Sequence, residues 1–206
     1  MTRRLALALL GLLLLQGCSA WRGATATRPA QAGAQASTAT PMAATNAALS
    51  DFASARSSEI SSARRTLDEI VQATARQPPA RQVRPRGIVT APFEVTDKQS
   101  AQTRSVETFD SLTVDLPLAL RGSPEHDAAM AGVKALAETL AKSRGSAEIV
   151  RAFAPADVRN EKIVLESAAA KSASGQDILV RRQSDPEVLR GFERIIVRGA
   201  ALPHRL

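Results

Sequence analysis

The chain has 206 residues, and its 27 Lys and Arg against 20 Asp and Glu give a formal net charge of +7. This charge is too small for the dense basic surface of a nucleic-acid-binding domain, and an aromatic content of 3%, without any Tyr, leaves few rings on which bases or sugars could stack. The single cysteine excludes an intrachain disulfide, so the fold has to be held together by its core alone.

The first residues have the pattern of a signal peptide. Arg3 and Arg4 precede an apolar run over residues 5–15, which is shorter than the roughly 20 residues that a membrane-spanning helix needs. The run leads into Leu15-Gln16-Gly17-Cys18, which resembles the lipobox of bacterial lipoproteins. That resemblance implies removal of residues 1–17, a diacylglycerol on the thiol of Cys18 and an acylated new amine, which together anchor a protein firmly in a membrane.

Two other interpretations of this segment remain open: an ordinary signal peptide with an incidental cysteine, and a retained transmembrane anchor. Ser19 follows the cysteine, and by resemblance to enterobacterial sorting a residue other than Asp at this position implies the outer membrane, with the chain facing the periplasm.

Residues 18–46 are mostly small and polar and cannot bury enough apolar surface to offset the entropy of ordering them, which predicts a flexible, disordered tether. Over residues 47–76 apolar side chains recur at helical spacing, which predicts an amphipathic helix that Pro78 and Pro79 end. This helix either packs on its own domain or pairs with a partner helix. Residues 77–87, rich in Pro and Arg, are expected to form a stiff connector.

The remainder, residues 88–200, is expected to form an α+β domain in the periplasm. Residues 88–95 surround Pro92 and predict a short edge strand or an extended loop, whereas residues 106–120 alternate between apolar and polar and predict a half-buried strand. A helix is expected between Ser123, its cap, and Gly145, its stop, and residues 147–154 predict a central strand.

Two further segments, 162–171 and 177–183, flank the turn-forming residues 173–176 and predict a hairpin, and residues 192–198 predict a last strand. The expected architecture is a small mixed β-sheet with one or two helices packed on one face.

The sequence predicts no catalytic site, cofactor or metal. His126 is expected as an exposed first-turn residue and His204 in a disordered tail, and neither has further ligands at metal-binding spacing. No nucleophile elbow or phosphate-binding glycine loop is visible. Convergence of carboxylates into a sugar-hydrolysing pair stays open, the candidates being Asp110, Asp115, Asp157 and Glu161.

A group of arginines is the candidate for binding an acidic partner or a glycan peptide. Its members lie on or beside the last two expected strands and are Arg181, Arg182, Arg190, Arg194 and Arg198. If these strands pair with each other, Arg194 and Arg198 share one face, where guanidinium groups could hold carboxylates. The alternative is a solvated sheet face, or an edge protected by charge.

Part of the domain resembles OmpA-like peptidoglycan-binding domains. The resemblance is carried by Thr108-Phe109-Asp110-Ser111, Ala135-Leu136-Ala137-Glu138-Thr139-Leu140, Ala147-Glu148-Ile149-Val150 and the strand at 192–198. It implies a domain behind a tether that binds the stem peptide through an Asp after the second strand and an Arg on the following helix. Asp157 matches the first position, but Arg159-Asn160 leads into Ile163-Val164-Leu165, so the second helix and its Arg are missing.

We therefore expect a non-enzymatic outer-membrane lipoprotein whose domain is a structural or docking component of an envelope-spanning assembly of the secretion, conjugation or pilus type. The alternative is a peptidoglycan-binding lipoprotein that tethers the outer membrane to the cell wall, and a third option is an enzyme inhibitor or a stress lipoprotein.

Overall fold

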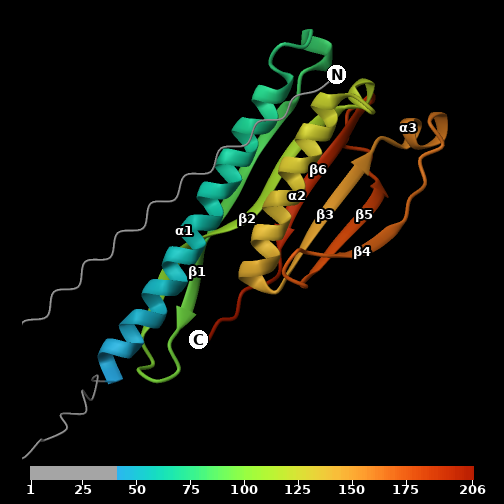
Figure 1. The fold of residues 1–206 in the computed structure, drawn as a ribbon. Helices are drawn as coiled ribbons and strands as arrows, with labels where there is room; N and C mark the ends of the chain where they lie inside the picture. The colour runs from blue at the N-terminus through green and yellow to red at the C-terminus, as the bar shows by residue number, and fades with distance from the viewer. Residues whose placement is uncertain (1–40) are drawn as a thin grey trace, which may run out of the picture. The chain divides into compact units, whose positions relative to one another are not determined.

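A six-stranded mixed sheet with two long helices on one face forms the part of the chain that the structure describes (Figure 1). This computed structural model describes residues 41–206, with side chains from residue 47 onward. The expected signal peptide, Cys18 and residues 18–40 of the tether lie outside the described residues. The elements are α1 Pro41–Thr74, β1 Arg84–Thr96, β2 Thr103–Pro117, α2 Pro124–Arg144, β3 Ser146–Phe153, α3 Pro155–Asn160, β4 Ser167–Lys171, β5 Asp177–Ser184 and β6 Phe192–Gly199, with short 3-10 turns at Pro79–Arg81 and Leu118–Leu120.

The strands lie in the order β1-β2-β6-β3-β5-β4. Within the described residues β3 and β5 pair in parallel, and the other neighbouring strands pair antiparallel. The expected α+β class, with helices on one face of a mixed sheet, is confirmed. The last two described strands, β5 and β6, do not pair with each other, however, because β3 lies between them. The pairing on which the predicted arginine group depends is therefore absent.

Helix α2 forms as its sequence predicts. The hydroxyl of Ser123 accepts a hydrogen bond from the backbone N–H of His126, Pro124 takes the first helical position, and Gly145 ends the helix in the left-handed conformation at φ 87°. One stripe of the helix is buried against the sheet and α1: Ala129, Val133, Leu136, Ala137, Leu140 and Ala141.

Helix α1 packs on its own domain, which answers the question that its sequence left open. Ile60, Ala63 and Ile70 belong to the same buried cluster as the apolar side chains of α2 and β2. The helix begins at Pro41, earlier than expected, and residues 41–206 lie within one compact unit. No helix in the described part of the chain is long and apolar enough to cross a membrane.

Strand β1 is longer than predicted. It starts at Arg84, so residues 84–87 belong to the sheet and not to a connector. The β1–β2 ladder skips Arg86 on one strand and Asp110 on the other. Such an irregularity changes which side chains face the core. It accounts for the burial of Phe109, an odd-numbered residue, on a strand whose core-facing residues 112, 114 and 116 are even-numbered.

The predicted hairpin is confirmed between β4 and β5, with its turn closed by the hydrogen bond from Ser172 N to Gln176 O. Its first strand is shorter than expected: residues 163–166 form no regular element, and β4 starts at Ser167.

Candidate functional site

A cleft of about 410 Å³ opens where residues 161–164 pass beside Phe153, the last residue of β3. We call it the cationic cleft, because four of its eight lining residues carry a positive charge and one a negative charge. The cations are Arg121, Arg151, Lys162 and Arg182, the carboxylate is Glu161, and the apolar lining is Phe153, Ile163 and Val164. Such an excess of cations in a recess attracts carboxylates and phosphates.

Two of these cations are neighbours across a strand pair. Arg151 of β3 and Arg182 of β5 are partners in the parallel register. Both lie on the helix-covered side of the sheet, since they share the parity of Ile149 and Val180, which pack in the main core. Like charges opposite each other destabilise a sheet, and an anion bound between them would remove that cost.

A buried carboxylate holds two of the arginines in place. Glu193 lies on the inward parity of β6 with Ile195 and Val197 and is fully buried. Arg151 donates to Glu193 Oε2 from Nε at 3.2 Å and from Nη2 at 2.5 Å, and Arg121 Nη2 lies 3.4 Å from the same oxygen. His126 Nε2 lies 2.9 Å from Glu193 Oε1.

The ionisation state of Glu193 follows from these contacts. Burial by itself would raise the pKa of Glu193. The hydrogen bonds from His126 and Arg151 and the charges of Arg151 and Arg121 outweigh burial and hold the pKa below its ordinary value. Glu193 is therefore a fixed anion that orients the cations beside it, from the buried side of the cleft.

The cations keep donors free for a ligand. The guanidinium carbon atoms of Arg121 and Arg151 lie 5.1 and 6.0 Å from the centroid of the Phe153 ring. The nearest carboxylate contacts on the open side are long: 3.5 Å from Arg121 Nη1 to Glu161, and 3.6 Å from Arg182 Nη1 to Glu166. These pairs are partly exposed and add little stability, so they can be exchanged for contacts with a ligand.

Lys162 reaches the cleft from a backbone that a lysine rarely adopts. Its φ is 50°, in the left-handed region that favours Gly. This conformation costs about 1 kcal/mol or more in a residue with a Cβ. Such positions persist where the surrounding chain enforces them, and they are concentrated at binding sites.

The arginine group predicted from the sequence is not brought together. Arg194 and Arg198 do share a face of β6, but it is the face away from the helices, and Arg194 is held by Asp115 with 2.9 Å between Nε and Oδ1. This hydrogen bond is the main reason that the pKa of Arg194 is raised. Arg181 points to that same face and pairs with Glu148, so Arg182 alone of the five lines the cationic cleft.

Other predicted positions also have different surroundings from those expected. His126 is largely buried against Glu193, not exposed, and His204 stacks on Phe93 with ring centroids 4.6 Å apart, so the described tail is ordered against β1. Three of the four candidate carboxylates contact different partners: Asp115 contacts Arg86 and Arg194, Asp157 the N–H of Gly191, and Glu161 contacts Arg121. Among residues 41–206 no group of three or more His, Cys, Asp or Glu could hold a metal ion.

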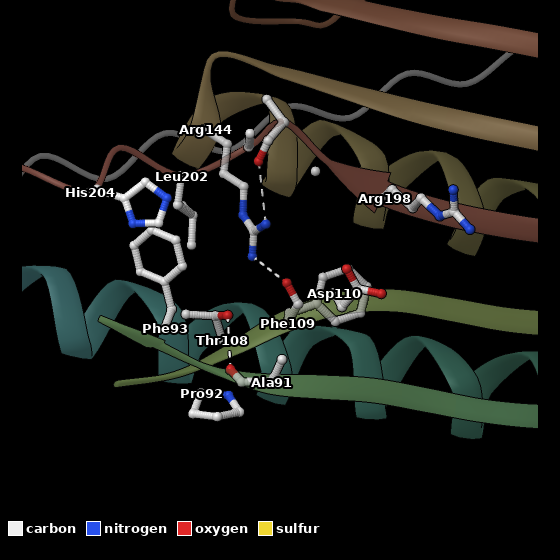
Figure 2. Close-up of a pocket in the computed structure, with 13 residues that line it drawn as sticks. Ala91, Pro92, Phe93, Thr108, Phe109, Asp110, Arg144, Arg198, Leu202 and His204 are labelled. Carbon is white, nitrogen blue, oxygen red and sulfur yellow. Dashed lines mark hydrogen bonds between the residues drawn. The ribbon is translucent and has the colours of Figure 1, made fainter. Parts of the chain in front are cut away.

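A second hollow, of about 290 Å³, lies between β2 and the C-terminal tail (Figure 2). Arg144 forms part of its wall, and Figure 2 shows the guanidinium reaching backbone oxygens: Nη2 donates to Phe109 O at 2.7 Å and Nη1 to Ala200 O at 3.4 Å. Its Nε and Nη2 also donate to the carboxylate of Glu59. Because this cation is already satisfied, we assign the hollow a structural role.

Sequence reasoning missed Arg121, Arg151, Lys162 and the supporting Glu193. A signal was present for two of them, because Glu193 and Arg151 are charged residues on the inward parity of otherwise apolar strands, and buried charges need partners. The chain matches no protein-family model, no curated protein and no solved structure.

Proposed function

We propose that this chain is an outer-membrane lipoprotein, anchored by lipid on Cys18, whose periplasmic domain is a non-catalytic docking component of an envelope assembly. The secretion, conjugation and pilus machineries are the classes of assembly that we consider. The partner presents carboxylates to the cationic cleft. The observation that carries this proposal is the lateral pairing of Arg151 and Arg182 in a recess that also contains Arg121 and Lys162.

The arrangement favours recognition of an anion for two reasons. Glu193 and Phe153 position Arg151 and Arg121 before any partner arrives, which reduces the entropy lost on binding. Guanidinium groups bind carboxylates through short, charge-assisted hydrogen bonds, and partial burial reduces the screening by salt. The lipobox residues Leu15, Gly17 and Cys18 support the anchor and hence the compartment.

Photo-crosslinking in living cells tests the docking. A benzophenone amino acid replaces Val164, whose side chain lines the cleft and is 62% exposed. The full chain should crosslink to a small, reproducible set of envelope proteins, and the double variant Arg182→Gln with Lys162→Gln should lose those crosslinks. The matched control is Arg104→Gln, which removes an exposed charge near the start of β2. Roughly 40 Å of strand separate this residue from the end of β2 at Pro117.

Two results would contradict the proposal. One is a crosslinking pattern that the double variant leaves unchanged, and the other is a loss of crosslinks in Arg104→Gln as large as in the double variant, which would indicate a general effect of charge.

A peptidoglycan-binding lipoprotein is the second candidate, favoured by the small volume of the cleft, which suits a compact carboxylate such as that of a stem peptide. Co-sedimentation with purified sacculi separates the two functions. Sedimentation of the full chain that is lost in Arg182→Gln with Lys162→Gln would favour peptidoglycan, and absence of sedimentation together with specific crosslinks would favour a protein partner.

A further inference from the structure

The two outer strands of the sheet differ in how their free edges are protected. Strand β1 contains Pro85 and Pro92, its ladder with β2 is shifted at two places, and Thr96 at its end bridges to Arg205 of the C-terminal tail. Prolines, bulges, covering segments and charged side chains are devices that prevent a sheet edge from pairing with another chain. The outer edge of β1 is therefore protected.

Strand β4 has one charged side chain and none of the other devices along its five residues. It contains neither Pro nor Gly, all five residues are exposed, and its one charge, Lys171, is neutralised by Asp177 at 2.6 Å. Figure 1 shows β4 at the outer side of the sheet, next to β5. Ala168, Ala169 and Ala170 have small side chains that leave room for those of an added strand.

The hydrogen-bonding register identifies the free backbone groups of β4. Arg182 N donates to Glu166 O, and Ser172 N donates to Gln176 O. Because antiparallel pairing alternates along a strand, residues 166, 168, 170 and 172 direct their backbone groups toward β5, and residues 167, 169 and 171 direct theirs outward. The outward N–H and C=O groups have no backbone partner in the described chain.

The segment that leads into β4 also lines the cationic cleft. Residues 161–164 line the cleft, Val164 and Leu165 expose 62% and 44% of their surface, and Glu166 lies opposite Arg182. A partner that pairs with β4 therefore meets apolar side chains and then cations as it extends beyond Ser167.

We propose that the partner docks by adding an extended, acidic segment antiparallel to the outer edge of β4. Its backbone pairs with residues 167, 169 and 171, and its C-terminal half carries acidic side chains into the cationic cleft. The antiparallel direction follows from the greater stability of such pairs, and the acidic character follows from the charge of the cleft. This inference rests on the proposed docking function and specifies how the docking occurs.

A peptide probe tests the inference on the full chain, labelled with nitrogen-15 and purified with its lipid in detergent. The probe is acetyl-Glu-Val-Glu-Thr-Glu-Val-Glu-amide, and the same peptide with Lys in place of Glu is its control. Binding should slow hydrogen exchange of the amides of residues 167, 169 and 171, and the lysine peptide should have no effect. The variant Ala169→Pro, which removes an outward N–H but no bond to β5, should weaken binding about tenfold or more, whereas Ala169→Thr, which keeps the N–H, should not.

The outcomes distinguish this inference from the function on which it rests. Unchanged binding in Ala169→Pro, together with loss of binding in Arg182→Gln with Lys162→Gln, would overturn strand addition and leave docking at the cleft intact. Unchanged binding in both variants would overturn both. Protection of these amides without peptide would also overturn the inference: if it rises with protein concentration the occupant is a second copy, and if it does not the occupant is a segment of the same chain.

Discussion

The side chain of Arg144 lies directly against Gly199, the last residue of the central strand β6, where an added Cβ would lie 2.5 Å from Arg144 Cδ. Glu59, Phe109 O and Ala200 O hold the guanidinium from different sides, so the side chain cannot easily move away. The contact joins the end of α2 to the end of β6 and to α1.

Substitution of Gly199 by Ala should therefore destabilise the domain by about 2 kcal/mol, the usual cost of overpacking. Chemical denaturation of the full chain measures the change. The control is Gly132→Ala in α2, where the nearest atoms would be 3.6 and 3.7 Å from the new Cβ. Since that contact is ordinary and Ala favours helix, Gly132→Ala should stabilise by about 0.5 kcal/mol; equal destabilisation by both substitutions would contradict the assigned role of Gly199.

Glu59 is the shared anion of two buried arginines, Arg56 and Arg144. Changing Glu59 to Gln leaves two guanidinium groups without a counter-charge and should cost about 4 kcal/mol of unfolding free energy. Arg56→Met should cost much less. Burial lowers the pKa of Arg56; the charge of Glu59 opposes this effect, and the charge of Arg144 adds to it. In addition, Arg56 Nε is buried and makes no hydrogen bond, so the charged side chain is poorly compensated. A larger loss in Arg56→Met than in Glu59→Gln would contradict this ranking.

Glu193 should contribute a pH-dependent part of the stability. Its folded pKa lies below the unfolded value of about 4.3, so its contribution is complete above that pH and is lost as the pH falls through the folded pKa. Glu193→Gln should cost about 3 kcal/mol at neutral pH. The difference between the wild type and the variant should shrink below about pH 4. Denaturation curves recorded from pH 7 to acid, with Glu107→Gln as an exposed control, provide the measurement; a difference that stays constant with pH would refute the role of Glu193.

Cys18 governs the predicted location. The variant Cys18→Ala should appear in the soluble fraction or remain unprocessed. Without the thiol no lipid can be attached, and the cleavage that follows lipid attachment cannot take place. Cell fractionation and the intact mass of the extracted protein test this expectation. A Cys18→Ala chain that still sediments with membranes at the processed size would contradict the anchor and, with it, the compartment.

Local signals explain what the sequence could predict. Ser123, Pro124 and Gly145 determine the limits of α2 through their own backbone preferences, and strict alternation over residues 112–116 identifies β2. These elements need no knowledge of the rest of the chain, and both form. The expected half-burial of β2 is wrong, however, because Ser111 and Asp115 on its other face are buried too, Asp115 by its contacts with Arg86 and Arg194.

Long-range relationships account for what was missed. The skipped residues Arg86 and Asp110 depend on how β1 and β2 pair, and the insertion of β6 between β2 and β3 depends on the whole sheet. The cationic cleft collects Arg121, Arg151, Lys162 and Arg182 from separate segments, two of which lie outside the strands, so their proximity depends on the assembled fold. The arginine group near the C-terminus was close in sequence, but alternation along β5 and the insertion of β3 separated its members.

The place of β6 has a consequence for how the chain matures. Among the described strands it is the last to leave the ribosome, yet it forms the ladders with β2 on one side and β3 on the other. Until residues 192–199 are available, the halves β1–β2 and β3–β5–β4 share no backbone pairing, so a growing chain cannot finish its sheet. A premature stop before residue 192 therefore removes a central strand of the sheet, with its ladders to both β2 and β3, and not an edge strand.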